Sequence, residues 1–235
     1  MQLIENNNHK IIGKDVKLFD YKRGRAYEEF SKCQDINQNI ISYLSTNYNF
    51  QNKIILESGA GSGKFTSFLA NNCSRLLVVE RSESLLQINM EKNKNKTNIK
   101  FFLSCMEEVE IEEKSLDIIF TGWSLTSLRY HFDVIIPKFK RILKNEGKVI
   151  SIENAGNDEF CKLMELEDFT HKINQKYYQY GFVPKKEIDT IISFPNKKVF
   201  YEAFSSKQEV VLPSLNIQHR VVVLEAEAKN LTFFN

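Results

Sequence analysis

The segment ESGAGSG places a carboxylate, Glu57, and three glycines directly after a short apolar run. Glycine adopts backbone conformations that other residues avoid, and it lets a ligand approach the main chain closely. Because open α/β sheets bind ligands at the carboxyl ends of their strands, this segment predicts a ligand-binding loop. The carboxylate of Glu57 would repel a pyrophosphate, whereas it would pair with a cationic amino group.

Two phosphate-binding patterns fit the loop poorly. In a P-loop, a hydroxyl that holds magnesium must follow the lysine, but Phe65 follows Lys64. In the dinucleotide pattern G-x-G-x-x-G, Lys64 stands where a third glycine allows close packing of helix and strand. A variant nicotinamide or flavin site and a glycine-rich turn without a ligand stay open as alternatives.

The pattern E-x-G-x-G-x-G fits at every position, with Glu57 followed by Gly59, Gly61 and Gly63. Combined with the carboxylate, it favours an adenosine ligand that carries an ammonium and a sulfonium group over a ligand that carries phosphates.

The surrounding chain predicts the elements that hold this loop. Short, nearly continuous apolar runs are typical of buried parallel strands, and they cover residues 53–57, 75–80, 99–104, 116–121 and 148–153. Helical patterns separate these runs, which predicts an α/β fold with helices on both faces of a parallel sheet. The runs 186–194 and 219–228 alternate in polarity and predict an antiparallel hairpin at the sheet edge.

On these motifs, residues from about 50 to 155 resemble the class I S-adenosylmethionine-dependent methyltransferases. The resemblance implies a Rossmann-like, doubly wound, mostly parallel sheet of seven strands with an antiparallel C-terminal hairpin at its edge. It implies a methyltransferase domain over residues 51–235, with a helical cap inserted at about 155–182. Residues 1–50 are expected to form an N-terminal helical cap, from about Arg23 onward, in which Tyr21, Arg25 and Tyr27 cover the cofactor.

The resemblance also assigns the cofactor contacts. Glu80 takes the two ribose hydroxyls, and a carboxylate with two acceptor oxygens suits a vicinal diol. Cys105 stands where the family usually has an aspartate, so adenine recognition passes to the Met106 backbone N–H and to Glu107 or Ser104. The implied cofactor-binding residues are Glu57, Gly59, Ala60, Gly61, Gly63, Glu80, Arg81, Ser82, Cys105, Met106, Thr121 and Gly122.

Catalysis and substrate binding depend on fewer residues. His131 is the predicted general base because histidine titrates near neutral pH. His219 is a weaker candidate, and each histidine could equally be structural. The predicted substrate residues are Trp123, Glu153, Asn154 and Tyr177.

The aromatic residues of segment 155–182 predict either a substrate cap or a helix packed on the core. Three acidic residues of this segment are candidates for attracting a cationic amine, or they form a solvated face; they are Glu165, Glu167 and Asp168.

Composition narrows the class of protein. A net charge of +2 over 235 residues gives no electrostatic case for a general nucleic-acid binder. The four cysteines have no C-x-x-C spacing, so we expect neither a zinc site nor a disulfide framework. No apolar run approaches the roughly 20 residues of a membrane span, and the first residues do not resemble a signal peptide. We therefore expect a cytoplasmic protein, as a monomer or homodimer, without a bound metal.

The resemblance implies methyl transfer from S-adenosylmethionine, with S-adenosylhomocysteine as the product. The expected acceptor is a nitrogen or oxygen nucleophile of a small molecule, natural product or peptide. The alternative is a non-catalytic methyltransferase-like module that binds the cofactor or a partner chain. Nucleic acid is the least favoured acceptor, because the segment LDIIFTGWSLTSL lacks the Asn/Asp-Pro-Pro-Tyr type of motif.

Overall fold

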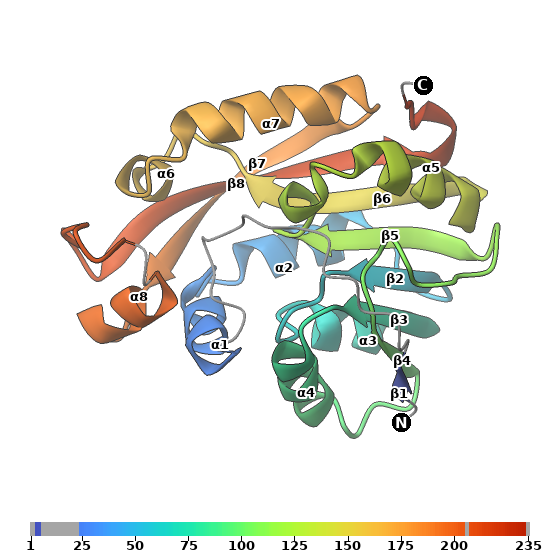
Figure 1. The fold of residues 1–235 in the computed structure, drawn as a ribbon, viewed down its shortest axis with the longest axis horizontal. Helices are drawn as coiled ribbons and strands as arrows, with labels where there is room; N and C mark the ends of the chain where they lie inside the picture. The colour runs from blue at the N-terminus through green and yellow to red at the C-terminus, as the bar shows by residue number, and fades with distance from the viewer. Residues whose placement is uncertain (1–2, 6–23, 205–206, 234–235) are drawn as a thin grey trace.

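The computed structural model describes residues 3–5, 24–204 and 207–233. The predicted helix start at Arg23 and the predicted cofactor contact Tyr21 lie outside these residues. The described chain forms one sheet of eight strands in the order β1-β4-β3-β2-β5-β6-β8-β7 (Figure 1). The strands are β1 Leu3–Glu5, β2 Ile54–Ser58, β3 Arg75–Glu80, β4 Ile99–Leu103, β5 Leu116–Gly122, β6 Leu143–Asn154, β7 Val183–Ser193 and β8 Asn216–Glu227.

The sheet confirms the predicted fold. Strands β1 to β6 pair in parallel, whereas β8 pairs antiparallel with β6 and β7 pairs antiparallel with β8. The seven predicted strands are all present. Strand β1, which pairs with β4 at the far edge, was not predicted from the sequence.

One predicted boundary was wrong. The apolar run predicted a strand over residues 148–153, but α5 ends at Ile142 and β6 already begins at Leu143. Leu143 pairs with Leu116, and a register shift follows before Ile118 pairs with Lys148. Gly147 therefore lies inside an irregular strand, where a Cβ atom would lie 3.1 Å from the carbonyl oxygen of Leu116.

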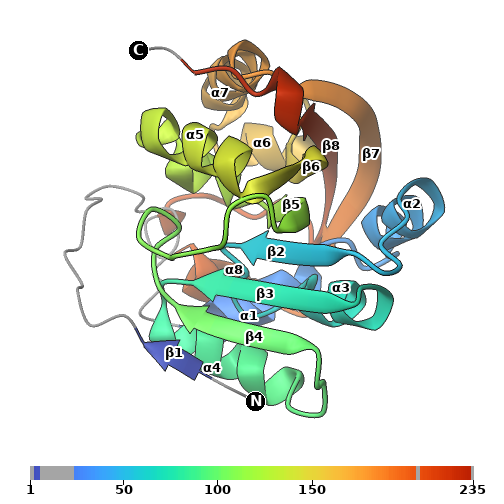
Figure 2. The same cartoon turned by 90° about the vertical axis from the view of Figure 1, so that its right-hand side faces the viewer.

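Helices cover both faces of the sheet (Figure 2). The helices are α1 Gly24–Cys33, α2 Asn39–Asn47, α3 Thr66–Asn72, α4 Glu83–Lys92, α5 Phe132–Ile142, α6 Glu159–Leu163, α7 Glu167–Gln179 and α8 Lys197–Ala203, with short 3-10 helices η1 Leu125–Leu128 and η3 Ala228–Asn230. Residues of α5, α7 and η3 share one buried apolar cluster with the strands. Residues of α2, α3 and α4 share a second cluster on the opposite face. The central strands are therefore buried on both sides, as their continuous apolar runs predicted.

A third apolar cluster lies beyond the sheet core, where the β7–β8 hairpin meets α1, α6 and α8. Phe30 of α1 packs edge-on against Phe204 at a centroid distance of 4.8 Å, and it stacks with Phe160 and Phe194. This cluster holds α1 in place beside the sheet, and it was not predicted from the sequence. Within the described residues, no helix combines the length and the apolarity that a membrane span requires.

The strand order creates a switch point at β2. The chain runs outward from β2 through β3 to β4 on one side, and through β5 to β6 on the other. A crevice opens at the carboxyl ends of parallel strands at such a point, and α/β proteins bind ligands there. The loop after β2 is the glycine loop.

Replacing Phe200 with alanine tests whether the third cluster folds together with the sheet. Phe200 is fully buried and packs against Phe194 and Phe204. We expect Phe200→Ala to lower the free energy of unfolding by about 3–5 kcal/mol, measured by urea denaturation with a single transition. The control Val211→Ala, at a side chain that is 77% exposed, should stay within about 0.5 kcal/mol of the parent. A separate transition for the cluster would contradict joint folding.

Candidate active site

The glycine loop has a backbone that only glycine adopts without strain. Gly59, Gly61 and Gly63 have φ angles of +67°, +55° and +88°, which lie in the left-handed region that side chains disfavour. A Cβ atom on Gly61 would lie 3.2 Å from Cε1 of Tyr27, and one on Gly59 would lie 2.5 Å from Cβ of Ser124. The loop is therefore closely approached by α1 and by the segment after β5.

Glu80, at the end of β3, fixes this loop. Its carboxylate accepts hydrogen bonds from the backbone N–H groups of Gly61, at 2.8 Å, and Ser82, at 2.7 Å. Burial raises the pKa of Glu80, whereas these two hydrogen bonds oppose the shift. A carboxylate offers about four acceptor positions, so the two backbone donors leave acceptor capacity for a ligand.

Glu57 is the second buried carboxyl group at this edge. It accepts a hydrogen bond of 2.6 Å from Oγ1 of Thr66, the first residue of α3. Burial raises the pKa of Glu57 to about 8, although the Thr66 hydroxyl opposes the shift. Glu57 and Ala60 line a small pocket beside the loop, together with Lys64.

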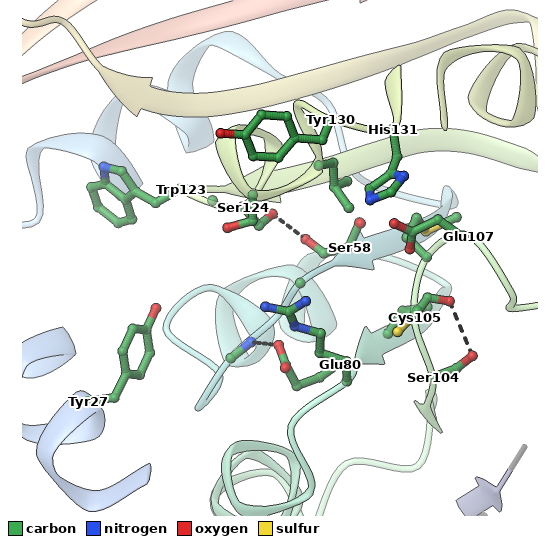
Figure 3. A pocket seen from close by; sticks show the side chains of 18 residues that line it. Tyr27, Ser58, Glu80, Ser104, Cys105, Glu107, Trp123, Ser124, Tyr130 and His131 are labelled. Carbon is green, nitrogen blue, oxygen red and sulfur yellow. Dashed lines mark hydrogen bonds between the residues drawn. The ribbon is translucent and has the colours of Figure 1, made fainter. Parts of the chain in front are cut away.

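The loop and Glu80 open onto a larger pocket of about 940 Å³, mouth included (Figure 3). Seven of the predicted cofactor residues line it: Gly59, Gly61, Glu80, Arg81, Cys105, Met106 and Gly122. Ser104 and Glu107 line it as well, and burial raises the pKa of the Cys105 thiol. Three predicted residues line neither of these pockets: Gly63, whose Cβ would meet Asn89 of α4, Ser82, and Thr121.

The predicted base His131 lies at the start of α5, where its backbone N–H bonds to the carbonyl of Leu128. It lines the larger pocket beside Glu107, and Figure 3 shows both on the side away from Trp123. His131 does not line the second large pocket, described below. A histidine in this place is positioned to contact the ligand of the first pocket.

Helix α1 is fastened over the glycine loop by two lysines. Nζ of Lys64 donates to the carbonyls of Ser31 and Gln34, both at 2.7 Å, at the carboxyl end of α1. A cation at this end of a helix is favourable because the helix dipole is negative there. Burial lowers the pKa of Lys64 to about 8. Lys92 of α4 similarly pairs with Glu28 of α1 at 3.2 Å and donates to the Ser62 carbonyl.

A second pocket, of about 860 Å³ including its mouth, adjoins the first. The two pockets share Tyr27, Trp123 and Ser127 as lining residues. Trp123 is strained, with φ of +52°, and its backbone N–H is held by the carbonyl of Ile152 at 2.8 Å. Such strain persists where the surrounding structure imposes it, and it gathers at functional sites.

Glu153, at the end of β6, is the carboxyl group of the second pocket. It accepts hydrogen bonds from Oγ1 of Thr126 at 2.7 Å, the backbone N–H of Leu125 and Oγ of Ser151. Burial raises the pKa of Glu153 to about 7, although these donors oppose the shift. Tyr177 does not line this pocket, because its ring is buried in the core and its hydroxyl bonds to Thr126 at 2.7 Å.

Asn154 also lines the second pocket, and it is held by a histidine. Nε2 of His219 lies 3.1 Å from Oδ1 of Asn154, and the imidazole ring stacks on Trp123 at a centroid distance of 6.2 Å. Burial lowers the pKa of His219 to about 4. His219 is therefore neutral at physiological pH and lines neither large pocket, so its contacts position Asn154 and Trp123.

Sequence reasoning missed several lining residues of the second pocket. Phe30 comes from α1 and Gln34 directly follows it, Thr126 comes from η1, and Thr170 and Asn174 come from α7. No local motif marks these residues, because the pocket forms only where α1, η1 and α7 converge. The aromatic residues of segment 155–182 were the one signal: Phe160 and Phe169 line the pocket, whereas Tyr177, Tyr180 and Phe182 are buried in the core.

Residues 56–151 match a family model described as a methyltransferase domain. The matched residues include the glycine loop and Glu80. This match confirms the resemblance to methyltransferases that the glycine loop and Glu80 had predicted. The predicted enzyme class and cofactor are those of the family that the model describes.

The curated relatives include phosphoethanolamine N-methyltransferases. One from Triticum aestivum is 27% identical over 58% of this chain, and one from Caenorhabditis elegans is 31% identical over 55%. This chain spans only 26% and 28% of their lengths. Among solved structures, a phosphoethanolamine N-methyltransferase 2 of Haemonchus contortus has a TM-score of 0.58 at 15% identity, covering 88% of this chain and 57% of that chain. This likeness supports the fold.

Replacing Glu57 with glutamine tests the buried carboxyl group. Its pKa is about 8 in the folded chain against an ordinary value of 4.5. The folded state therefore holds an extra proton between these values, and this carboxyl makes unfolding easier as pH rises from about 5 to 8. Glu57→Gln lacks this effect. We compare the free energy of unfolding of Glu57→Gln with that of the parent by chemical denaturation. From pH 5.5 to pH 8.5, we expect this difference to change by roughly 1 kcal/mol or more in favour of the variant.

The control for Glu57→Gln is Glu83→Gln, because Glu83 is exposed in the first turn of α4. It should shift stability equally at both pH values. A difference between Glu57→Gln and the parent that does not change with pH would contradict a raised pKa for Glu57.

Proposed function

We propose that this chain transfers a methyl group from S-adenosylmethionine to a nitrogen or oxygen nucleophile of a small-molecule acceptor, with S-adenosylhomocysteine as the other product. The observation that carries the proposal is the pair of adjoining pockets that share Tyr27, Trp123 and Ser127. A donor and an acceptor need such neighbouring sites because the reacting atoms must come within about 3–3.5 Å.

The first pocket fits an adenosyl cofactor in its donor and acceptor groups. Glu80 retains acceptor capacity for ribose hydroxyls, and the left-handed glycines leave the space that side chains would fill. Glu57, in the small pocket beside Ala60, is the proposed partner of the methionine amino group. When bound, S-adenosylmethionine supplies a methyl group on a positively charged sulfur. The N–H groups of Gly59, Ala60 and Gly61 donate to β3, and the buried carboxyl groups Glu57 and Glu80 suit that cation.

The second pocket is the proposed acceptor site. Its walls orient the acceptor, and its aromatic residues exclude water from the nucleophile. Such positioning can contribute roughly 7–11 kcal/mol to catalysis, so a general base is optional. The similarity to phosphoethanolamine N-methyltransferases favours nitrogen over oxygen as the acceptor atom. A cytoplasmic location and a monomeric or homodimeric state stay predictions from the sequence.

Calorimetric titration with S-adenosylhomocysteine tests the cofactor site in the parent and in Glu80→Gln. The amide removes the charge of Glu80 and one of its acceptor positions while keeping its shape. Because hydrogen bonds to a charged group contribute about 1.5–3 kcal/mol, we expect Kd to rise about 10-fold to 100-fold. The control Glu83→Gln changes an exposed carboxylate three residues further on and should leave Kd unchanged.

The other outcomes separate the remaining alternatives. Failure of the folded parent to bind S-adenosylhomocysteine would overturn the proposal. Binding of NAD or ATP in its place would mean that the loop holds a phosphate-bearing ligand. Binding of the adenosyl ligands without methyl transfer to any acceptor would support the non-catalytic module.

Replacing His131 with asparagine tests the predicted general base. A general base contributes about 10²–10⁴-fold to rate, so a catalytic His131 requires a loss of that size in kcat with the Kd of S-adenosylhomocysteine unchanged. His131 lines the first pocket and not the second. We therefore expect the opposite pattern in His131→Asn, in which Kd rises several-fold and kcat falls less than 10-fold.

A further inference from the structure

We propose that the second pocket binds an acceptor with a primary or secondary ammonium group on an apolar or aromatic body, without phosphate or carboxylate groups. This assignment rests on the proposed function, because it names the substrate class of the same site. Four features of the described pocket carry it: its aromatic walls, its one carboxylate, its unpartnered buried polar atoms and its lack of cationic side chains.

The walls of the pocket are aromatic. Tyr27 and Phe30 come from α1, Phe160 comes from α6, Phe169 comes from α7, and Trp123 lies between the two pockets. The faces of aromatic rings attract cations within about 6 Å, and this attraction strengthens where water is excluded. An apolar or aromatic body would bury these walls further, whereas a short hydrophilic acceptor would leave them in contact with water.

One carboxylate serves the pocket, and it is not one of those that the sequence suggested. Glu165, Glu167 and Asp168 are exposed and do not line the pocket, and Glu165 pairs with Lys207 at 2.7 Å. Glu153 does line it, and the donors that contact it are neutral: the hydroxyls of Thr126 and Ser151 and backbone N–H groups. No positively charged side chain of the described residues contacts this buried carboxylate. A ligand cation would therefore supply its positive partner.

Two buried polar atoms of the lining residues have no hydrogen-bond partner in the described structure. They are Nε1 of Trp123, a donor, and Oδ1 of Asn174, an acceptor. The amide nitrogen of Asn174 is already used, because it donates to the carbonyl of Asn154 at 3.3 Å. Unpartnered buried polar groups are costly. A methyl-accepting substrate with an N–H group would donate a hydrogen bond to the amide oxygen of Asn174.

The pocket has no lysine or arginine among its described lining residues. The nearby cations are engaged elsewhere. Arg129 donates to the carbonyl of Thr126 and to the hydroxyl of Tyr130, and Lys176 donates to the carbonyl of Arg129. A phosphate bound beside Glu153 would place like charges together in a poorly hydrated site, which is unfavourable. The substrate class therefore differs from phosphoethanolamine, which the names of several relatives contain.

The only tryptophan of the chain gives a direct readout, because Trp123 lines both pockets. The protein is saturated with S-adenosylhomocysteine at pH 8, above the pKa of about 7 for Glu153. It is then titrated with phenethylamine, 2-phenylethanol and phosphoethanolamine, with tryptophan fluorescence and calorimetry as readouts. We expect phenethylamine to bind with a Kd at least 10-fold below that of either other compound.

Glu153→Gln separates recognition of the ammonium group from binding of the ring. We expect the variant to raise the Kd of phenethylamine about 10-fold or more, while the Kd of 2-phenylethanol and that of S-adenosylhomocysteine change less than twofold. Unchanged binding of S-adenosylhomocysteine also shows that the variant is folded. The matched control Glu165→Gln, outside the pocket, should behave as the parent.

The outcomes keep this inference separate from the proposed function. If S-adenosylhomocysteine fails to bind the parent, the proposed function falls. If it binds, the inference is overturned by phosphoethanolamine binding as tightly as phenethylamine, by 2-phenylethanol binding as tightly, or by none of the three binding. It is also overturned if Glu153→Gln leaves the Kd of phenethylamine unchanged.

Discussion

The site depends on the tie between the carboxylate at the end of β3 and the loop at the end of β2. Glu80 accepts the Gly61 N–H, while the N–H groups of Gly59 and Ala60 donate to the carbonyl of Val79 in β3. Three backbone donors of one loop thus point at the neighbouring strand, and this requires φ angles that only glycine adopts freely. The loop curls toward β3, which leaves space for a ligand above the switch point. Helix α1 can then cover the loop, because no side chain of Gly61 intervenes.

The part of this arrangement that could be predicted from the sequence is local along the chain. The glycine loop, its carboxylate and Glu80 lie within one strand–helix–strand unit, so spacing alone related them. The strands were predictable for a similar reason, because a strand buried on both faces must be apolar throughout. The hairpin of β7 and β8 followed from alternating polarity. The early start of β6 at Leu143, rather than at residue 148, shows the limit of this approach, because Leu143 pairs with Leu116 in the sheet without any local signal for it.

The second pocket could not be predicted, because it joins segments that are distant in sequence. Phe30, Trp123, Glu153 and Phe169 share its lining although they span about 140 positions of the chain. Helical periodicity also left the rotation of α7 undetermined. The structure turns Tyr177 into the core, where it reaches Glu153 only through Thr126, and it leaves the acidic residues at the start of α7 in solvent. The left-handed backbone of Trp123 has no sequence signal, since tertiary contacts impose it.

Charge links the two pockets into one site. Three strands end in buried carboxyl groups, Glu57 on β2, Glu80 on β3 and Glu153 on β6. Lys64, which follows the loop, donates to the backbone carbonyls of Ser31 and Gln34 rather than to any of the three carboxyl groups. Burial raises the pKa of a carboxyl group, as it does for all three, although Lys92 opposes the shift for Glu57 and Arg81 opposes it for Glu80. A bound cation offsets that cost. A sulfonium cofactor and an ammonium acceptor would both do so, whereas a phosphate would add to it, so the same field selects both proposed ligands.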